Sequence, residues 1–342
     1  MLMTDPTGAA AATEDPGWRI FRGDGTQRRV KLPPAPPWRR FTHREDGAEG
    51  DGGGETRADD AAGTAPKARY VIGEEEADVI NAALHLRRPL LVTGHPGVGK
   101  TALADAVAHE LDLGPVLRWP VNSRSTLQDA LYRYDAIGRL QEGSLATEAG
   151  QAAPSIGRYV RLGPLGTALV PAERPRVLLV DELDKGDVDL PNDLLTVFEE
   201  GSFEIPELSR LPDSQSAVDV FTADRGEQVT VRRGFVRCTE FPVVVITSNG
   251  ERDFPPAFRR RCLPLNLHDP RPERLKQIIL GHLGPDALAE ADDLVAAFLK
   301  ERSMKELATD QLLNAVFLRH GGARLDPEGL LRSVLHQLNS GG

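Results

Sequence analysis

The sequence predicts an α/β fold, in which a parallel sheet flanked by helices is followed by a small all-helical lid domain. One observation is a set of nearly continuous apolar runs, which are typical of strands buried on both faces of a parallel sheet. These runs lie at 89–94, 116–121, 176–182 and 241–249. The other is a helical pattern from about residue 270 onward, punctuated by glycine and proline. The helical segments lie at 271–282, 287–302, 309–320 and 328–338.

Composition excludes several classes of protein. The chain has 342 residues and a net charge of −10, which argues against a nucleic-acid coat or a polybasic membrane binder. Cys238 and Cys262 are too few for a disulfide framework and fit no zinc spacing. The N-terminus lacks the features of a secretory signal, and no apolar run is long enough to span a membrane. We therefore expect a cytoplasmic protein without a membrane partner, for which nucleic acid is an unfavoured partner.

The N-terminal part differs from the rest of the chain. Residues 18–41 combine aromatic residues with a PPAPP run, which favours a stiff polyproline II segment. This segment is either a docking peptide, for the protein's own body or for a partner, or an ordinary disordered leader. Residues 42–67 are acidic and Gly-rich, as in a linker. We therefore divide the chain into a largely disordered leader and linker at 1–67, an α/β domain at 68–268 and a helical lid at 269–342.

The segment GHPGVGKT matches the phosphate-loop pattern G-x-x-x-x-G-K-[ST] at every fixed position. It follows a predicted buried strand and precedes a predicted helix at 100–111, so main-chain N–H groups and the helix N-terminus can surround phosphate oxygens. We expect Lys100 to reach the β- and γ-phosphates and the Thr101 hydroxyl to ligate Mg²⁺. The nucleotide-binding residues predicted here are Gly94, His95, Pro96, Gly97, Val98, Gly99, Lys100 and Thr101.

Polar residues end the third and fourth predicted strands, at 176–182 and 241–249. Asp181 and Glu182 close the run VLLVDE, and successive residues at the end of a strand point in different directions. Asp181 is placed to hold Mg²⁺ through water, beside Thr101. Glu182 is placed to orient and polarise an attacking water molecule. Asn249 closes FPVVVITSN, where it can hold that water and donate to a phosphate oxygen.

Three adjacent arginines, 259–261, follow Asn249 by about ten residues. An arginine beside a phosphoryl group that is gaining charge stabilises the transition state, and it can be supplied by a neighbouring chain. The alternative for these residues is a solvated or ion-paired helix end.

In this order, the motifs resemble those of AAA+ ATPases. GHPGVGKT resembles Walker A, VLLVDE Walker B, ITSN sensor 1, and AFRRRC the arginine-finger segment. GPLG at 163–166 and NDLLTVFEEGSFEIPE at 192–207 are similar to the MoxR-type branch, and the resemblance covers about residues 70–320. It implies a ring, usually a hexamer, with ATP and Mg²⁺ bound between subunits. It also implies a chaperone-like remodelling role, often together with a von Willebrand A-type protein.

The resemblance also implies roles for individual residues. Asn249 would be sensor 1, and Arg261 would be the arginine finger, with Arg260 as the second candidate. Members of the family carry a sensor 2 arginine early in the third lid helix, but LATDQLL at 307–313 has none, so that role stays unassigned.

Two insertions enlarge the predicted nucleotide-binding domain, at 123–171 and 202–237. The roughly alternating segment 227–238 predicts a β-hairpin. In the family such insertions face the pore or a client, and the alternative is surface elaboration.

Three functions compete at this stage. The first is an ATP-hydrolysing motor that remodels a protein client. The second is a nucleotide-gated switch or scaffold that recruits partners and turns over slowly. The third, which the acidic net charge disfavours, is a motor acting on nucleic acid.

Overall fold

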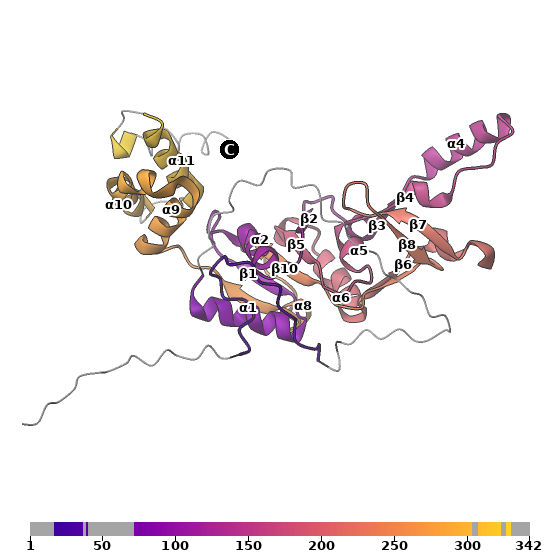
Figure 1. Ribbon diagram of the computed structural model, residues 1–342, viewed down its shortest axis with the longest axis horizontal. Coiled ribbons are helices and arrows are strands. Elements are labelled where there is room, and N and C mark those ends of the chain that lie inside the picture. The colour runs from indigo at the N-terminus through magenta and orange to yellow at the C-terminus, as the bar shows by residue number, and fades with distance from the viewer. Residues whose placement is uncertain (1–16, 37–38, 40–71, 303–306, 323–325, 330–342) are drawn as a thin grey trace, which may run out of the picture.

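The computed structural model describes residues 17–36, 39, 72–302, 307–322 and 326–329. These residues form an α/β body with a second sheet at one end and a helical lid at the other (Figure 1). The predicted linker 42–67 and nearly all of the predicted helix 328–338 lie outside the described residues.

The body is built on a five-stranded sheet, sheet A, in which every described pairing is parallel. The strands, in spatial order, are β11 (Leu263–Asn266), β1 (Leu90–Thr93), β10 (Val243–Ser248), β5 (Val177–Asp181) and β2 (Leu117–Pro120). The four predicted strands are confirmed, and β11 was missed. Its sequence LPLN is short and contains Pro264, which pairs with Leu91. An edge strand tolerates a proline because one of its sides needs no ladder.

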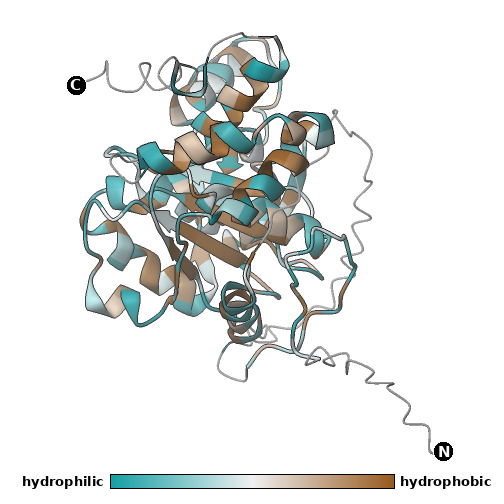
Figure 2. Ribbon diagram, turned by 90° about the vertical axis from the view of Figure 1, so that its left-hand side faces the viewer, coloured by the Kyte–Doolittle hydropathy of each residue, from teal (hydrophilic) through white to brown (hydrophobic). Residues whose placement is uncertain are grey.

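Alternate side chains of the central strands point into two separate hydrophobic cores, one on each face of the sheet. On β5, Leu178 and Val180 point to one core, whereas Val177 and Leu179 point to the other. All four are at most 1% exposed, which is why the strands read as unbroken apolar runs. Figure 2 shows the hydrophobic strands enclosed by helices that carry both hydrophilic and hydrophobic residues.

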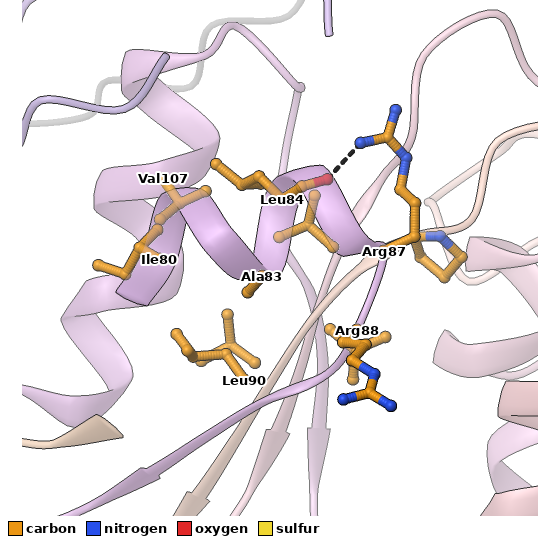
Figure 3. Close-up of a pocket in the computed structure, with 11 residues that line it drawn as sticks. Ile80, Ala83, Leu84, Arg87, Arg88, Leu90 and Val107 are labelled. Carbon is orange, nitrogen blue, oxygen red and sulfur yellow. Dashed lines mark hydrogen bonds between the residues drawn. The ribbon is translucent and has the colours of Figure 1, made fainter. Parts of the chain in front are cut away.

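Two helices, α1 (Glu74–Leu86) and α2 (Lys100–Glu110), cover one face of sheet A. Helix α1 begins with three acidic residues, which suit the positive end of the helix dipole. It ends where Arg87 turns into the left-handed region and donates to the Leu84 carbonyl oxygen. Figure 3 shows the small pocket between these helices and the strands, lined by apolar side chains such as Ile80 and Val107.

The other face of sheet A packs against four further helices. These are α3 (Leu127–Leu131), α5 (Pro164–Ala168), α6 (Leu190–Glu200) and α8 (Pro256–Arg259). Buried residues of all four, among them Leu165, Leu194 and Phe258, share one core with the inserted segments. The insertions are therefore continuous with the body.

The two insertions form one six-stranded sheet, which the sequence did not predict. In spatial order its strands are β3 (Tyr132–Tyr134), β4 (Val160–Leu162), β7 (Ala217–Phe221), β8 (Gln228–Arg232), β9 (Phe235–Arg237) and β6 (Ser202–Glu204). The predicted hairpin at 227–238 is confirmed as β8 and β9. Its turn residues, Arg233 and Gly234, both have positive φ, as a type I′ hairpin turn requires.

Helix α4 (Ala136–Glu148) extends from this second sheet away from the body, and a short helix, α7 (Pro206–Ser209), follows β6 (Figure 1). The N-terminus of α4 is capped by Asp135, whose carboxylate accepts the N–H of Gly138 at 2.8 Å. Ile137, Leu140 and Leu145 on α4 are between 64% and 73% exposed. The helix therefore presents an apolar stripe that no described residue covers.

The lid contains α9 (Pro272–Ala289), α10 (Asp292–Arg302) and α11 (Thr309–His320), which share their own core. The predicted break at Gly284 is present, with φ of 85° inside α9. The predicted helix 287–302 is instead divided at Glu290, because Asp292 and Asp293 begin a new first turn. Within the described residues, no helix combines the length and hydrophobicity needed to cross a membrane.

Residues 17–36 run along α1 and α2 as a strap on the protein's own body. The Phe21 ring is fully buried in the core beneath these helices. Asn81 of α1 accepts the N–H groups of Ile20 and Phe21 at 2.9 Å each. Glu110 of α2 accepts those of Arg22 and Gly23. Residues 18–41 were expected to be either a docking peptide or a disordered leader. In the described residues 18–36, the structure shows a segment docked on the protein's own body.

The buried position of Phe21 leads to a stability prediction. Phe21→Ala should lower the free energy of unfolding by about 3–5 kcal/mol, because it leaves a cavity between the strap and α1. Urea denaturation measures this loss. Leu140→Ala, which removes a side chain that is 73% exposed, is the control and should change stability by less than about 0.5 kcal/mol. Equal effects of the two substitutions would show that the strap is not part of the folded body.

Candidate nucleotide-binding site

The candidate site lies where β1, β5 and β10 end at the same edge of sheet A. The phosphate loop 94–101 connects β1 to α2. Gly94, Gly97 and Gly99 have φ values of 146°, 78° and 97°, which residues with a side chain rarely adopt. A Cβ on Gly94 would also come within 2.4 Å of the Leu267 carbonyl oxygen. The conformation of the loop therefore depends on glycine at these positions.

The Lys100 ammonium is surrounded by oxygen acceptors. Its Nζ donates to the carbonyl oxygens of Gly94 at 2.6 Å and His95 at 3.1 Å, and to Oδ1 of Asn249 at 2.6 Å. Burial lowers the pKa of Lys100. Three nearby carboxylates act in the opposite direction and favour the charged form; they belong to Asp184, Glu182 and Asp181. The site thus keeps a cation in a part-buried position.

Asp181 lies beside two hydroxyl groups. Its Oδ1 accepts hydrogen bonds from Thr101 Oγ1 at 3.1 Å and from Thr247 Oγ1 at 2.6 Å. Thr247 is fully buried, and its oxygen also accepts the main-chain N–H of Glu182 at 2.8 Å. The structure therefore joins the end of β5 to both the phosphate loop and β10.

Glu182 points away from Asp181 and toward Asn249, as alternating direction at a strand end predicts. Its backbone is left-handed, with φ of 58° and ψ of 50°, so the chain turns sharply after Asp181. Glu182 Oε1 accepts a hydrogen bond from Asn249 Nδ2 at 3.1 Å, and Oε2 accepts one from Lys185 Nζ at 2.8 Å. The Asn249 amide therefore links the Glu182 carboxylate to the Lys100 ammonium.

The arginine run occupies the short helix α8 and the residues after it. Arg259 and Arg260 are exposed. Arg261 pairs through Nε with the Glu199 carboxylate of α6, and it donates to the Ala257 carbonyl oxygen at 3.2 Å. The structure brings Lys100, Asp181, Glu182 and Asn249 together, but the contacts of Arg261 are with α6 and α8.

The lid touches the phosphate loop at the start of α11. A Cβ added to Gly97 would lie 2.3 Å from the Ala308 Cβ and 3.1 Å from the Thr309 nitrogen, so these backbones are in close contact. Arg302, which lies near the unassigned sensor 2 position, instead donates to the Pro270 carbonyl oxygen and stacks on Phe298.

Comparisons with known proteins identify the family. A family model described as "AAA domain (dynein-related subfamily)" matches residues 89–262. The chain belongs to this family. Curated relatives include two proteins named "Chaperone protein ClpB". The protein of Chlamydia caviae is 28% identical over 197 residues, which are 54% of this chain and 21% of that protein. The protein of Chlamydia trachomatis is 28% identical over 183 residues, which are 51% and 19%. The similarity thus spans about a fifth of the length of these relatives.

The AAA domain carries residues suited to ATP with Mg²⁺. The open glycine-rich loop leads into the N-terminus of α2, where main-chain N–H groups favour anions. Thr101 Oγ1 and Asp181 Oδ1 lie 3.1 Å apart. Hydroxyl and carboxylate oxygens are the kind of ligand that Mg²⁺ prefers. These residues fit a magnesium–nucleotide complex.

Two residues of the site were missing from the sequence prediction. Thr247 is a fully buried polar residue that follows four apolar residues of β10, and this change from apolar to polar was its signal. Asp184 is 4% exposed, and its Oδ2 accepts main-chain N–H groups from the segment after β10. The only sign of Asp184 in the sequence was that it is a third acidic residue close to Asp181 and Glu182.

Lys100 gives the binding prediction for this site. Lys100→Ala should weaken the binding of a non-hydrolysable ATP analogue about 10–100-fold, because charge-assisted hydrogen bonds to phosphate are lost. Isothermal titration calorimetry with Mg²⁺ measures the change. Lys31→Ala removes an exposed lysine and should leave the affinity unchanged. Equal affinity of the two variants would contradict the assignment of Lys100.

Proposed function

We propose that this chain is an ATP-hydrolysing AAA+ ATPase of the MoxR type, which works as a ring and remodels a protein client. One observation carries the proposal: a continuous set of hydrogen bonds runs from the Lys100 ammonium through the Asn249 amide to the Glu182 carboxylate. It lies beside the Thr101–Asp181 pair. Cation, amide, carboxylate and hydroxyl are the groups that phosphoryl transfer to water requires.

Each group has a distinct part in this mechanism. The phosphate loop and Lys100 bind the β- and γ-phosphates, while Thr101 and Asp181 would hold Mg²⁺, which would neutralise phosphate charge. Glu182 orients and polarises the attacking water, and Asn249 holds that water against the γ-phosphate. In the structure Glu182 bonds to Asn249 and Lys185, so part of its acceptor capacity is already in use.

The MoxR-type assignment is supported by the region after Walker B. Helix α6 ends in Glu199–Glu200 and is followed directly by β6 and a β-rich insertion, which is similar to that branch. The chaperone relatives support a protein client. The apolar stripe on α4, together with Phe235 of β9, which is 47% exposed, is suited to contact with an unfolded client or a von Willebrand A-type partner.

A ring is supported by the position of the arginine run. Arg261 lies at the surface beside α6 and α8, where its side chain is 40% exposed while it is paired with Glu199. We assign it to the nucleotide of the neighbouring subunit, with Arg260 as the second candidate, in a ring that is usually a hexamer in this family.

The first test concerns hydrolysis. Glu182→Gln should bind ATP within about threefold of the unchanged protein, but turn it over about 10²–10⁴-fold more slowly, because the water is no longer polarised. A phosphate-release assay measures turnover. The matched control is Glu200→Gln, which alters an exposed carboxylate on α6. Normal turnover by the Glu182 variant would reject the assignment.

The second test concerns the ring. Lys100→Ala and Arg261→Ala should each be nearly inactive alone. Mixing them should restore activity, because some sites then combine an intact phosphate loop with an intact Arg261 from the neighbour. Phosphate release is measured over a range of mixing ratios. Arg260→Ala replaces Arg261→Ala in a parallel series, and the absence of recovery in both series would exclude an arginine supplied in trans.

The alternative is a nucleotide-gated switch with slow turnover. It is favoured by one observation: the part of α11 beside the phosphate loop, Thr309–Leu313, contains no arginine. Turnover per chain, measured with and without a client protein, separates the switch from the motor.

A further inference from the structure

Asp184 is the most deeply buried of the three carboxylates near Lys100. It lies in the 3₁₀ helix η3 (Leu183–Lys185) and is 4% exposed. Its Oδ2 accepts the main-chain N–H groups of Asn249 at 3.0 Å and Glu251 at 3.1 Å. Its Oδ1 is buried without a hydrogen-bond partner among the described residues. A buried carboxylate is costly unless it is well paired, so an apolar residue would suit this position better if it served packing alone.

The two hydrogen bonds lie where the sheet no longer orders the chain. The pairing of β10 with β5 ends at Ile246 and Val180, and its pairing with β1 continues to Ser248, the residue before Asn249. Beyond this point no ladder with β5 fixes the main chain that carries the Asn249 side chain. The contacts to Asp184 replace that ladder.

A second contact joins the same two segments in the opposite direction. Arg252 Nη2 donates to the carbonyl oxygens of Gly186 at 2.7 Å and Asp187 at 3.3 Å. A side chain after β5, Asp184, thus accepts main-chain N–H groups of the segment after β10. A side chain after β10, Arg252, donates to main-chain carbonyl oxygens of the segment after β5. This reciprocal pairing fixes the two loops relative to each other.

We propose that Asp184 is a positioning residue for Asn249. By holding the N–H groups of Asn249 and Glu251, Asp184 sets the main chain so that the Asn249 amide reaches both Glu182 Oε1 at 3.1 Å and Lys100 Nζ at 2.6 Å. The effect on hydrolysis rests on the function proposed above. The anchoring of the loop does not, because the hydrogen bonds that hold it join only residues of this chain.

The test compares Asp184→Ala with Asp184→Asn. Alanine removes the acceptor, whereas asparagine keeps one side-chain oxygen that can accept both N–H groups. Asp193→Ala, an exposed position on α6, is the control. Three quantities are measured: the kcat and KM for ATP, the affinity for a non-hydrolysable ATP analogue, and hydrogen–deuterium exchange of the peptide containing 249–253. Thermal melting shows whether each variant is folded.

For Asp184→Ala we expect kcat to fall at least about tenfold, with analogue affinity within about threefold, because the loss of positioning acts on the water and not on the phosphate loop. Exchange at 249–253 should be at least about tenfold faster without nucleotide. Asp184→Asn should restore both to within about threefold of the unchanged protein.

Unchanged exchange in Asp184→Ala would overturn the proposal, and so would an asparagine variant as impaired as the alanine variant. The latter result would indicate that the charge, and not the position of the acceptor, is what matters. If the unchanged protein hydrolyses no ATP, the proposed function fails. The exchange data for the three variants still decide the role of Asp184 in that case.

Discussion

The parallel register of β1, β10 and β5 is the constraint on which the rest of the structure depends. Leu90 pairs with Val245, and Val243 pairs with Val177, so the three strands end at one edge. This places the phosphate loop, Asp181–Glu182 and Asn249 side by side, although they are separated by about 70 residues or more in the sequence. Had one strand slipped by a single residue, its inward and outward side chains would have exchanged, and Thr247 would have pointed away from Asp181.

Electrostatics explains why this edge suits a nucleotide. Burial disfavours the charge of Lys100, and Asp184, Glu182 and Asp181 oppose that effect. A site with three carboxylates and one ammonium would repel a polyphosphate by charge alone. The phosphate loop counters this repulsion with main-chain N–H groups at the start of α2, and Mg²⁺ would neutralise acidic groups on the opposite side. The three carboxylates are therefore compatible with nucleotide binding, because the nucleotide would bind together with Mg²⁺.

The parts predicted from sequence are those with a local signal. The apolar runs identified four strands of sheet A, and the fixed spacing GHPGVGKT identified the loop at 94–101. Features that depend on pairing distant segments were missed. The second sheet needs β4 from one insertion to pair with β7 from the other, and short strands such as 160–162 carry too little periodicity to show this. The docking of Phe21 was undecided because it depends on Asn81 and Glu110, polar residues whose burial no local pattern revealed.

Glu110 and Asp184 use the same physical device in two places. Each is a buried carboxylate that accepts two main-chain N–H groups from a segment distant in the sequence: Arg22 and Gly23 for Glu110, Asn249 and Glu251 for Asp184. Burial nevertheless raises the pKa of Glu110, so the hydrogen bonds only partly offset desolvation. Each buried carboxylate therefore costs desolvation energy, and it fixes a main-chain segment that has no strand pairing of its own. At Glu110 the ordered chain is the strap, and at Asp184 it is the loop that carries the Asn249 amide into the site.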